Sequence, residues 1–238
     1  MKALIALLVI LLLGALAGGG YFYLENKHAQ KDLVELRDRN SEMQFQVESL
    51  QGQVENLAKQ LEEEIARVSL EKEAEMKRLK EAQNELIEEL KGEIEQKQIQ
   101  ITQLADRLSV SMVDQILFPS GEADLTPAGL KVIERVGNII KGVKDKIIRV
   151  EGHTDNVPIH PRLQKEFPTN WELSTTRATN VVRFLQEKVG IPPENLEAIG
   201  LSEFHPIASN KTKVGRSKNR RIEILLLPKE QREGISQE

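Results

Sequence analysis

Cysteine is absent from this sequence of 238 residues. Its absence excludes a disulfide framework, a thiolate metal site, a cysteine nucleophile and a lipid-modified cysteine. Aromatic residues are scarce at 4%, whereas charged residues reach 29%. These are unusual values for one compact globule of this length, and they indicate that part of the chain is not globular. Glycine and proline, at 15 and 9 residues, are too few for a collagen-like or disordered chain.

Charge is missing from residues 3–24, which read ALIALLVILLLGALAGGGYFYL. A helix of this length can cross a hydrocarbon core of roughly 30 Å. We therefore expect residues 1–26 to form a membrane anchor. The alternative is a cleaved signal peptide, with Lys2 as its positive end and Ala15-Leu16-Ala17 as its cleavage site. No Asp or Glu lies inside the run, so it offers no carboxylate that could relay a proton.

Proline is absent from residues 33–108, where apolar residues recur at alternating spacings of three and four. This heptad pattern, with Asn40 at a seam position, predicts a parallel two-stranded coiled coil over residues 27–110. Later spacings of four and four predict a looser distal half. A single solvated helix with pairs such as Glu73–Lys77 is the alternative. The seam residues are Leu33, Leu36, Asn40, Met43, Val47, Leu50, Val54, Leu57 and Leu61.

Strand and helix patterns alternate after residue 110 and predict an α+β two-layer sandwich of the βαβαβ type over residues 111–229. Thr126-Pro127 is a helix start, because Thr caps and Pro suits the first helical position. Residues 230–238 are expected to be a frayed tail. The expected strands are 113–118, 147–151, 196–200 and 221–227, and the expected helices are 127–141 and 171–189.

Several separated motifs in this part follow one signature in the right order. They are Val150-Glu151-Gly152-His153-Thr154-Asp155, Leu173-Ser174-Thr175-Thr176-Arg177-Ala178, Asn210, Gly215-Arg216 and Asn219-Arg220-Arg221-Ile222-Glu223. Residues 112–228 thereby resemble the OmpA-like peptidoglycan-binding domain. Two further stretches resemble its MotB-type branch: Asn156-Val157-Pro158-Ile159 and Phe167-Pro168-Thr169-Asn170-Trp171-Glu172-Leu173.

The resemblance implies a ligand, the diaminopimelate end of the peptidoglycan stem peptide. That end is a zwitterion, so its site needs one anion and one cation. Asp155 can accept from the ammonium, and Arg177 can hold the carboxylate through its planar fork. Without the resemblance, such a pair would be read as a surface salt bridge of about 0–1 kcal/mol.

The same resemblance points to further binding residues. Asn170 and Leu173 enter the helix that carries Arg177, where backbone amides can face a carboxylate, although Asn170 can equally be a plain helix cap. Phe118 and Ser120 stand where many relatives have Phe and Asp, so a second carboxylate is missing there. Thr154 and Arg221 complete the expected set.

Other site chemistries find no support in the sequence. His153 and Ser174 do not form a serine-hydrolase pattern, because Ser174 is not on a Gly-x-Ser-x-Gly elbow. His153, His160 and His205 lack a metal-ligand spacing, so no metal and no cofactor are expected. Six cations in residues 211–221 lack interleaved aromatics, so we expect no nucleic-acid partner.

The expected molecule is a noncovalent envelope tether. It would be a single-pass protein of the inner membrane and a parallel homodimer, with its C-terminal domain gripping peptidoglycan in the periplasm. A stator-type subunit or accessory protein of a flagellar-like ion-driven motor is the alternative. A cell-wall enzyme is disfavoured, because no nucleophile, metal or acid–base pair is apparent.

Overall fold

The computed structural model describes residues 2–229 and divides into two compact units, residues 1–69 and 70–238. Within the described residues, no helix carries an apolar stretch of the length that a membrane crossing requires. The anchor predicted over residues 1–26 includes residue 1 and the side chains of residues 2–6 and 9, which lie outside the described part. The tail predicted over residues 230–238 lies outside it as well.

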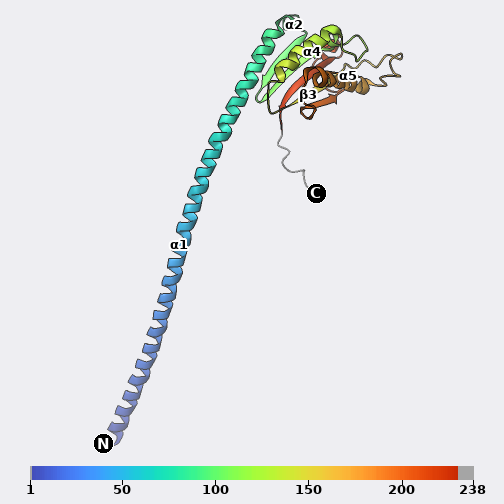
Figure 1. Cartoon of the computed structure of the whole chain (residues 1–238). Helices are drawn as coiled ribbons and strands as arrows, with labels where there is room; N and C mark the ends of the chain where they lie inside the picture. Colours follow the sequence, from blue (N-terminus) through green and yellow to red (C-terminus); the bar gives the residue numbers. More distant parts are fainter. Residues whose placement is uncertain (1, 230–238) are drawn as a thin grey trace. The chain divides into compact units, whose positions relative to one another are not determined.

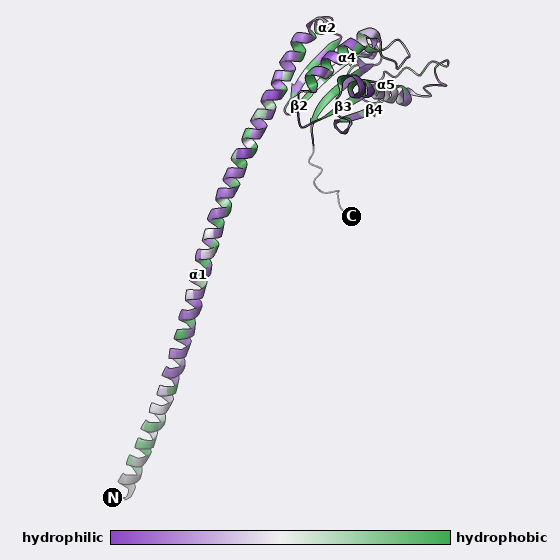
Figure 2. Cartoon of the chain, in the orientation of Figure 1, coloured by the Kyte–Doolittle hydropathy of each residue, from purple (hydrophilic) through white to green (hydrophobic). Residues whose placement is uncertain are grey.

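Helix α1 runs from Lys2 to Glu89 and makes up the described part of the first unit (Figure 1). Hydrophilic and hydrophobic residues alternate along it (Figure 2). The apolar residues of the heptad seam are all exposed in the single chain, with Leu33 at 59% and Leu57 at 63%. A lone helix cannot bury such a seam, so another helix or surface is needed to cover it.

The second unit is built around one five-stranded sheet of order β1-β2-β5-β3-β4. Strands β3 and β4 are parallel, and the other neighbouring pairs are antiparallel. The strands are β1 (Ile99–Leu104), β2 (Arg107–Val113), β3 (Lys146–His153), β4 (Leu196–Gly200) and β5 (Arg221–Pro228).

Helices pack on one face of this sheet. Besides the end of α1, the helical elements are α2 (Lys91–Glu95), α3 (Asp114–Leu117), α4 (Pro127–Ile140), α5 (Asn170–Phe184), the π turn η1 (Leu185–Val189), the 3-10 turn η2 (Pro193–Asn195) and α6 (Lys213–Asn219). The predicted α+β fold is confirmed by this mixed architecture.

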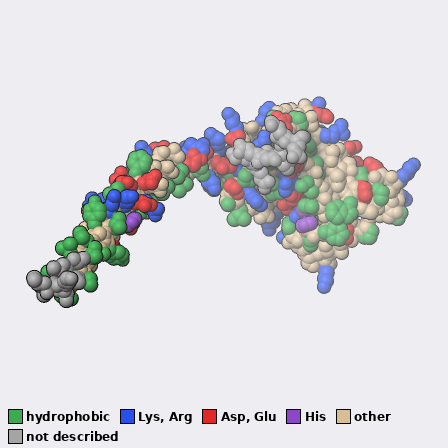
Figure 3. Space-filling model, turned by 90° about the horizontal axis from the view of Figure 1, so that it is seen from below, with side chains coloured by type: hydrophobic (Ala, Val, Ile, Leu, Met, Phe, Trp, Pro, Cys, Tyr) green, Lys and Arg blue, Asp and Glu red, His purple; other side chains and the backbone are tan. Residues whose placement is uncertain are grey.

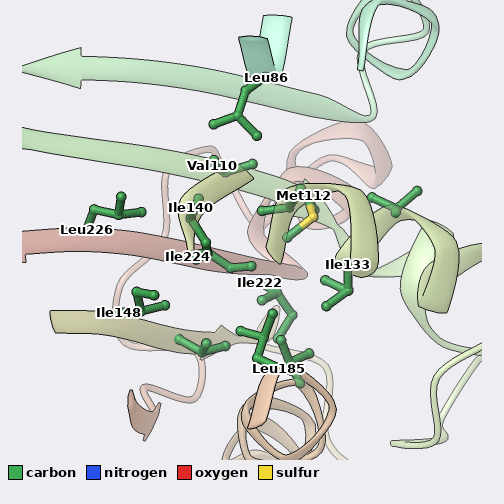
Figure 4. Packing of buried hydrophobic residues seen from close by; sticks show 14 of the residues in the cluster. Leu86, Val110, Met112, Ile133, Ile140, Ile148, Leu185, Ile222, Ile224 and Leu226 are labelled. Atoms are coloured by element: carbon green, nitrogen blue, oxygen red, sulfur yellow. The ribbon is translucent and has the colours of Figure 1, made fainter. Parts of the chain in front are cut away.

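The core lies between the helices and the inner face of the sheet. Figure 4 shows Ile222, Ile224 and Leu226 of β5 facing Ile133 and Ile140 of α4. Leu79, Leu86 and Leu90 join the same core and are fully buried. The last turns of α1 therefore belong to the C-terminal domain.

The prediction of a helical stalk up to residue 110 was wrong at its C-terminal end. The chain leaves the helical path after α2, and residues 99–113 form the β1–β2 hairpin. The spacing of Leu86, Leu90 and Ile94 reflects packing against the sheet, since all three contact its core. The predicted strand over residues 113–118 was also wrong, because β2 ends at Val113 and α3 follows.

The other predicted elements are confirmed with small shifts of boundary. Thr126 caps α4, and its Oγ1 accepts a hydrogen bond from the Gly129 amide at 2.9 Å. The helix predicted over 171–189 is α5 continued by the π turn η1, and Gly190 ends it with a positive φ of 75°. Helix α6 was not predicted from the sequence.

Candidate functional site

Three strands bring charged residues to one edge of the sheet. Arg221 lies opposite both Val113 and His153, so the end of β2, the start of β5 and the end of β3 share one row. Asp114, Arg220 and Asp155 follow directly beyond this row. The Asp114 amide donates to the Arg220 carbonyl at 3.0 Å, which ties two of these positions together.

Helix α5 supplies a fourth charged side chain, that of Arg177. Thr169 caps it in a capping box with Glu172, whose carboxylate accepts from the Thr169 amide at 2.8 Å. The Thr169 hydroxyl donates to the same carboxylate, and this bond, with the backbone amide bonds, lowers the pKa of Glu172. The buried residues in the first turns of α5 include the polar Asn170, Ser174 and Arg177, whereas those from Ala178 onward are apolar. Because Asn170 is the first helical residue, Thr169 and not Asn170 is the cap.

The four charged side chains alternate in sign. Arg220 Nη1 donates to Asp155 Oδ2 at 2.6 Å, and Arg220 Nε lies 3.4 Å from Asp114 Oδ2. Arg177 Nη1 lies 3.3 Å from the same Asp114 oxygen. We call Asp155, Arg220, Asp114 and Arg177 the charged array. All but Arg220 are more than nine-tenths buried.

Burial and charge act against each other in this array. Burial raises the pKa of Asp114, although Arg177 and Arg220 pull it down. Burial likewise lowers the pKa of Arg177, although Asp114 opposes that shift. Burial also opposes the charged form of Arg220, but its bonds to Asp155 and Asp114 outweigh burial, so the pKa of Arg220 is raised. Burial therefore outweighs the opposite charges around both Asp114 and Arg177.

Two polar atoms beside the array have no hydrogen-bond partner among the described residues. They are Asp114 Oδ1 and Thr154 Oγ1, and both are buried. Buried polar atoms without partners are rare, so each calls for an explanation such as a bound ligand or water. Asp114 Oδ1 is thus the carboxylate oxygen of the array that has no hydrogen-bond partner among the described residues.

Neighbouring side chains fix the geometry of the array. Asn170 Nδ2 donates to the Asp155 carbonyl at 3.3 Å and to Glu203 Oε2 at 2.6 Å. Asp155 Oδ1 accepts from the Val157 amide at 3.0 Å, which closes a turn in the loop. The Arg177 guanidinium lies 4.9 Å above the centre of the Phe118 ring, a cation–π contact. Its Nε also donates to the Glu122 carbonyl at 2.9 Å.

The structure brings some of the predicted site residues together and separates others. Five of the predicted residues belong to the array or its surroundings, namely Asp155, Arg177, Asn170, Phe118 and Thr154. Of the remaining three, Ser120 is exposed, Leu173 packs with Ala123 and Phe167, and Arg221 pairs with Glu223 on the opposite face of the sheet.

Two members of the array, Asp114 and Arg220, were not among the binding residues expected from the sequence. Asp114 was placed inside an expected strand, although the alternation Leu108-x-Val110-x-Met112 already marks β2 and its end. Arg220 belongs to the quoted motif, yet only the pairing of β5 with β2 and β3 shows that it lies between two aspartates. Asp114 is the second carboxylate of the array, beside that of Asp155.

An exposed aromatic pair flanks the loops around Asn170. Trp171 and Phe204 are stacked with ring centroids 5.5 Å apart. Acidic and basic side chains are intermingled over the face of the C-terminal domain seen in Figure 3.

Comparison with known proteins identifies the family of the C-terminal domain. Residues 117–220 match the OmpA family. Motility protein B of Bacillus subtilis is 34% identical over 158 residues, which cover 63% of this chain and 59% of that protein. The chain thus spans little more than half of this relative.

Two solved structures share the fold. A putative MotB-like protein from Desulfovibrio vulgaris has a TM-score of 0.59 and 25% identity, covering 66% of this chain and 95% of that one. The cell wall anchor of the T6SS from Pseudomonas aeruginosa has a TM-score of 0.54 and 30% identity, covering 60% of this chain and 96% of that one. The chain belongs to the OmpA family, with MotB proteins among its relatives.

Proposed function

We propose that this protein is a noncovalent peptidoglycan tether that recognises the diaminopimelate end of the stem peptide. The single observation that carries the proposal is the charged array. A zwitterion presents an ammonium and a carboxylate on one carbon, and the array presents both complementary charges at one edge of the sheet. A relative whose solved structure is described as a cell wall anchor supports the same role. The role needs binding only, without catalysis.

The array suggests how the ligand would be held. Arg177 would receive the ligand carboxylate through its guanidinium. Asp155 and Asp114 Oδ1 would accept from the ammonium. Burial raises the pKa of Asp114, so a ligand cation at Oδ1 would compensate a carboxylate that burial disfavours. Arg220 would keep both aspartates in place through its two contacts.

Competition with free amino acids tests this ligand. The full chain should sediment with purified peptidoglycan sacculi, and added diaminopimelate should release it. Lysine blocked at its α-amino and carboxyl groups keeps the side-chain ammonium but has no free amino-carboxylate centre, so it should release much less protein. Equal release by the two compounds would contradict recognition of the zwitterionic end.

We further propose where the other parts of the chain lie in the cell envelope. Residues 3–24 carry no charge and would anchor the chain in the inner membrane, with the C-terminal domain in the periplasm. The exposed seam of α1 would be covered by a second copy in a parallel coiled coil. The coil would space the wall-binding domain from the membrane.

A peptide covering residues 27–69 is expected to be a helical dimer in sedimentation equilibrium. Asn40→Ile should raise its melting temperature but give a mixture of oligomers, because a buried Asn fixes strand number at a cost in stability. Ser41→Ile, one residue away and off the seam, is the matched control and should leave the dimer unmixed. A monomeric peptide would refute the coiled coil.

A role in an ion-driven motor is the second candidate. The similarity to motility protein B favours it, since that match extends beyond the residues assigned to the OmpA family. The uncharged run of residues 3–24 argues against a proton-carrying subunit, because it contains no Asp or Glu. An accessory role beside such a motor would still need the wall-binding site.

A further inference from the structure

The face of the sheet opposite the helices carries a second cluster of chemical groups. Glu151 and Glu223 lie directly opposite each other on β3 and β5. His153, two residues beyond Glu151, points to the same face because side chains alternate along a strand. Atoms of these three side chains that could bind a metal all lie within 4.8 Å of one another.

His153 has a feature that points to a missing partner. It is only 4% exposed, and neither ring nitrogen makes a hydrogen bond with any described residue. Its Nε2 is 3.7 Å from Glu151 Oε2, so the ring is aimed into the cluster. A buried imidazole without hydrogen bonds is costly unless something else occupies its lone pair.

We propose that Glu151, His153 and Glu223 bind a divalent transition-metal ion, with Zn²⁺ as the best match. One imidazole nitrogen and two carboxylate oxygens are ligands that Zn²⁺ accepts at about 2.0–2.2 Å. Tetrahedral ligands at that length lie about 3.3 Å apart, so small side-chain rotations would close the cluster around the ion. Mg²⁺ and Ca²⁺ prefer oxygen ligands alone, and the imidazole therefore selects against them.

Two neighbouring side chains, those of Arg221 and His205, contact the cluster. Arg221 Nε donates to Glu223 Oε1 at 2.5 Å, which orients that carboxylate and leaves its other oxygen for the metal. The ring of His205 lies edge-on to that of His153, with centroids 6.4 Å apart. Sequence spacing could not reveal the site, because Glu223 comes from a strand that follows His153 by 70 residues.

The metal would connect β3 to β5 beside the charged array. His153 immediately precedes Thr154 and Asp155, and its partner in the strand pairing, Arg221, immediately follows Arg220. A bound ion would therefore hold together the two strand ends that carry Asp155 and Arg220. This site does not depend on the proposed function, because it lies on the opposite face of the sheet.

Calorimetric titration of the chelator-treated full chain with Zn²⁺ tests the proposal. One ion should bind per chain, and the melting temperature should rise with Zn²⁺ but not with Mg²⁺. Glu151→Gln and Glu223→Gln should each weaken the affinity at least tenfold, and His153→Gln should abolish saturable binding. Co²⁺ should give visible absorption bands in the wild type that disappear in His153→Gln.

Glu197→Gln is the matched control, because Glu197 lies on the same sheet but pairs with Arg149 outside the cluster. It should bind Zn²⁺ like the wild type. Absence of stoichiometric Zn²⁺ binding by the wild type would overturn the proposal whatever the variants do. Binding that survives His153→Gln, or an equal thermal shift with Mg²⁺, would overturn it too.

Discussion

Arg177→Ala should abolish binding of the full chain to peptidoglycan and to free diaminopimelate. Arg177 is 3% exposed, so the ligand carboxylate would meet it away from water. Removing one partner of such a pair costs about 2–5 kcal/mol, because the other charge stays buried without compensation. Affinity should therefore fall by about 30-fold to several thousand-fold.

Conservative variants separate the charge from its geometry. Arg177→Lys should recover only part of the affinity, because an ammonium cannot donate two parallel hydrogen bonds to a carboxylate. It would also lose the planar contact over the Phe118 ring. Asp155→Asn keeps the shape of the side chain but removes its charge, so it should weaken binding of the ligand ammonium. Calorimetric titration with diaminopimelate measures all three variants.

Arg183→Ala is the control on the same helix. Arg183 is exposed and lies 3.8 Å from Glu187, far along α5 from the array, so its removal should leave the affinity unchanged. Circular dichroism should show that each variant is folded. Affinity for diaminopimelate that is unchanged in folded Arg177→Ala would refute this assignment, even if the domain still bound the wall.

A shorter fragment would be a poor substitute for the full chain in these experiments. Strand β2 begins at Arg107, and Leu79, Leu86 and Leu90 are buried in the domain core. A fragment starting near residue 112 would lose the β1–β2 hairpin and the end of α1. The boundary of the domain therefore lies well before the residue at which the helical pattern fades.

The helix and strand patterns in residues 126–227 could be predicted because local signals and packing agree there. Thr126 and Pro127 mark a helix start, and the burial of Ile148 and Val150 follows the period of a strand. The β1–β2 hairpin was missed because its two-residue turn lacks the usual Asn-Gly. Ala105 takes a positive φ of 50° there. An alanine in the sequence does not indicate this conformation, whereas Asn or Gly would.

The site could be predicted only as far as its motifs reach. Asp155 and Arg177 lie in recognisable segments, and the fold places them at the two ends of the array, with Arg220 and Asp114 between them. Asp114 and Arg220 enter the site through strand pairing, which a single sequence does not specify for strands so far apart. Arg221, one step further along the chain than Arg220, turns its side chain to the other face of the sheet, where it pairs with Glu223.

Gly152→Ala should strongly destabilise the domain. A Cβ atom at this position would lie 2.2 Å from the Ser174 carbonyl oxygen, which is closer than any atomic contact allows. The obstacle is backbone, so α5 itself would have to move away from β3. Overpacking of this kind costs about 1–3 kcal/mol and occasionally more, and we expect the upper end. Chemical denaturation of the variant measures this cost.

The same displacement should reach the ligand site. Ser174 and Arg177 occupy neighbouring turns of α5, and the Ser174 hydroxyl accepts from the Ser202 amide at 3.1 Å. A shift of that turn would draw Arg177 from Asp114, so diaminopimelate binding should weaken along with stability. Gly92→Ala is the control: no atom lies within 4 Å of its added Cβ, and alanine is the better helix former by up to about 1 kcal/mol. Equal stability of the two variants would mean that the close approach of α5 to β3 does not constrain the domain.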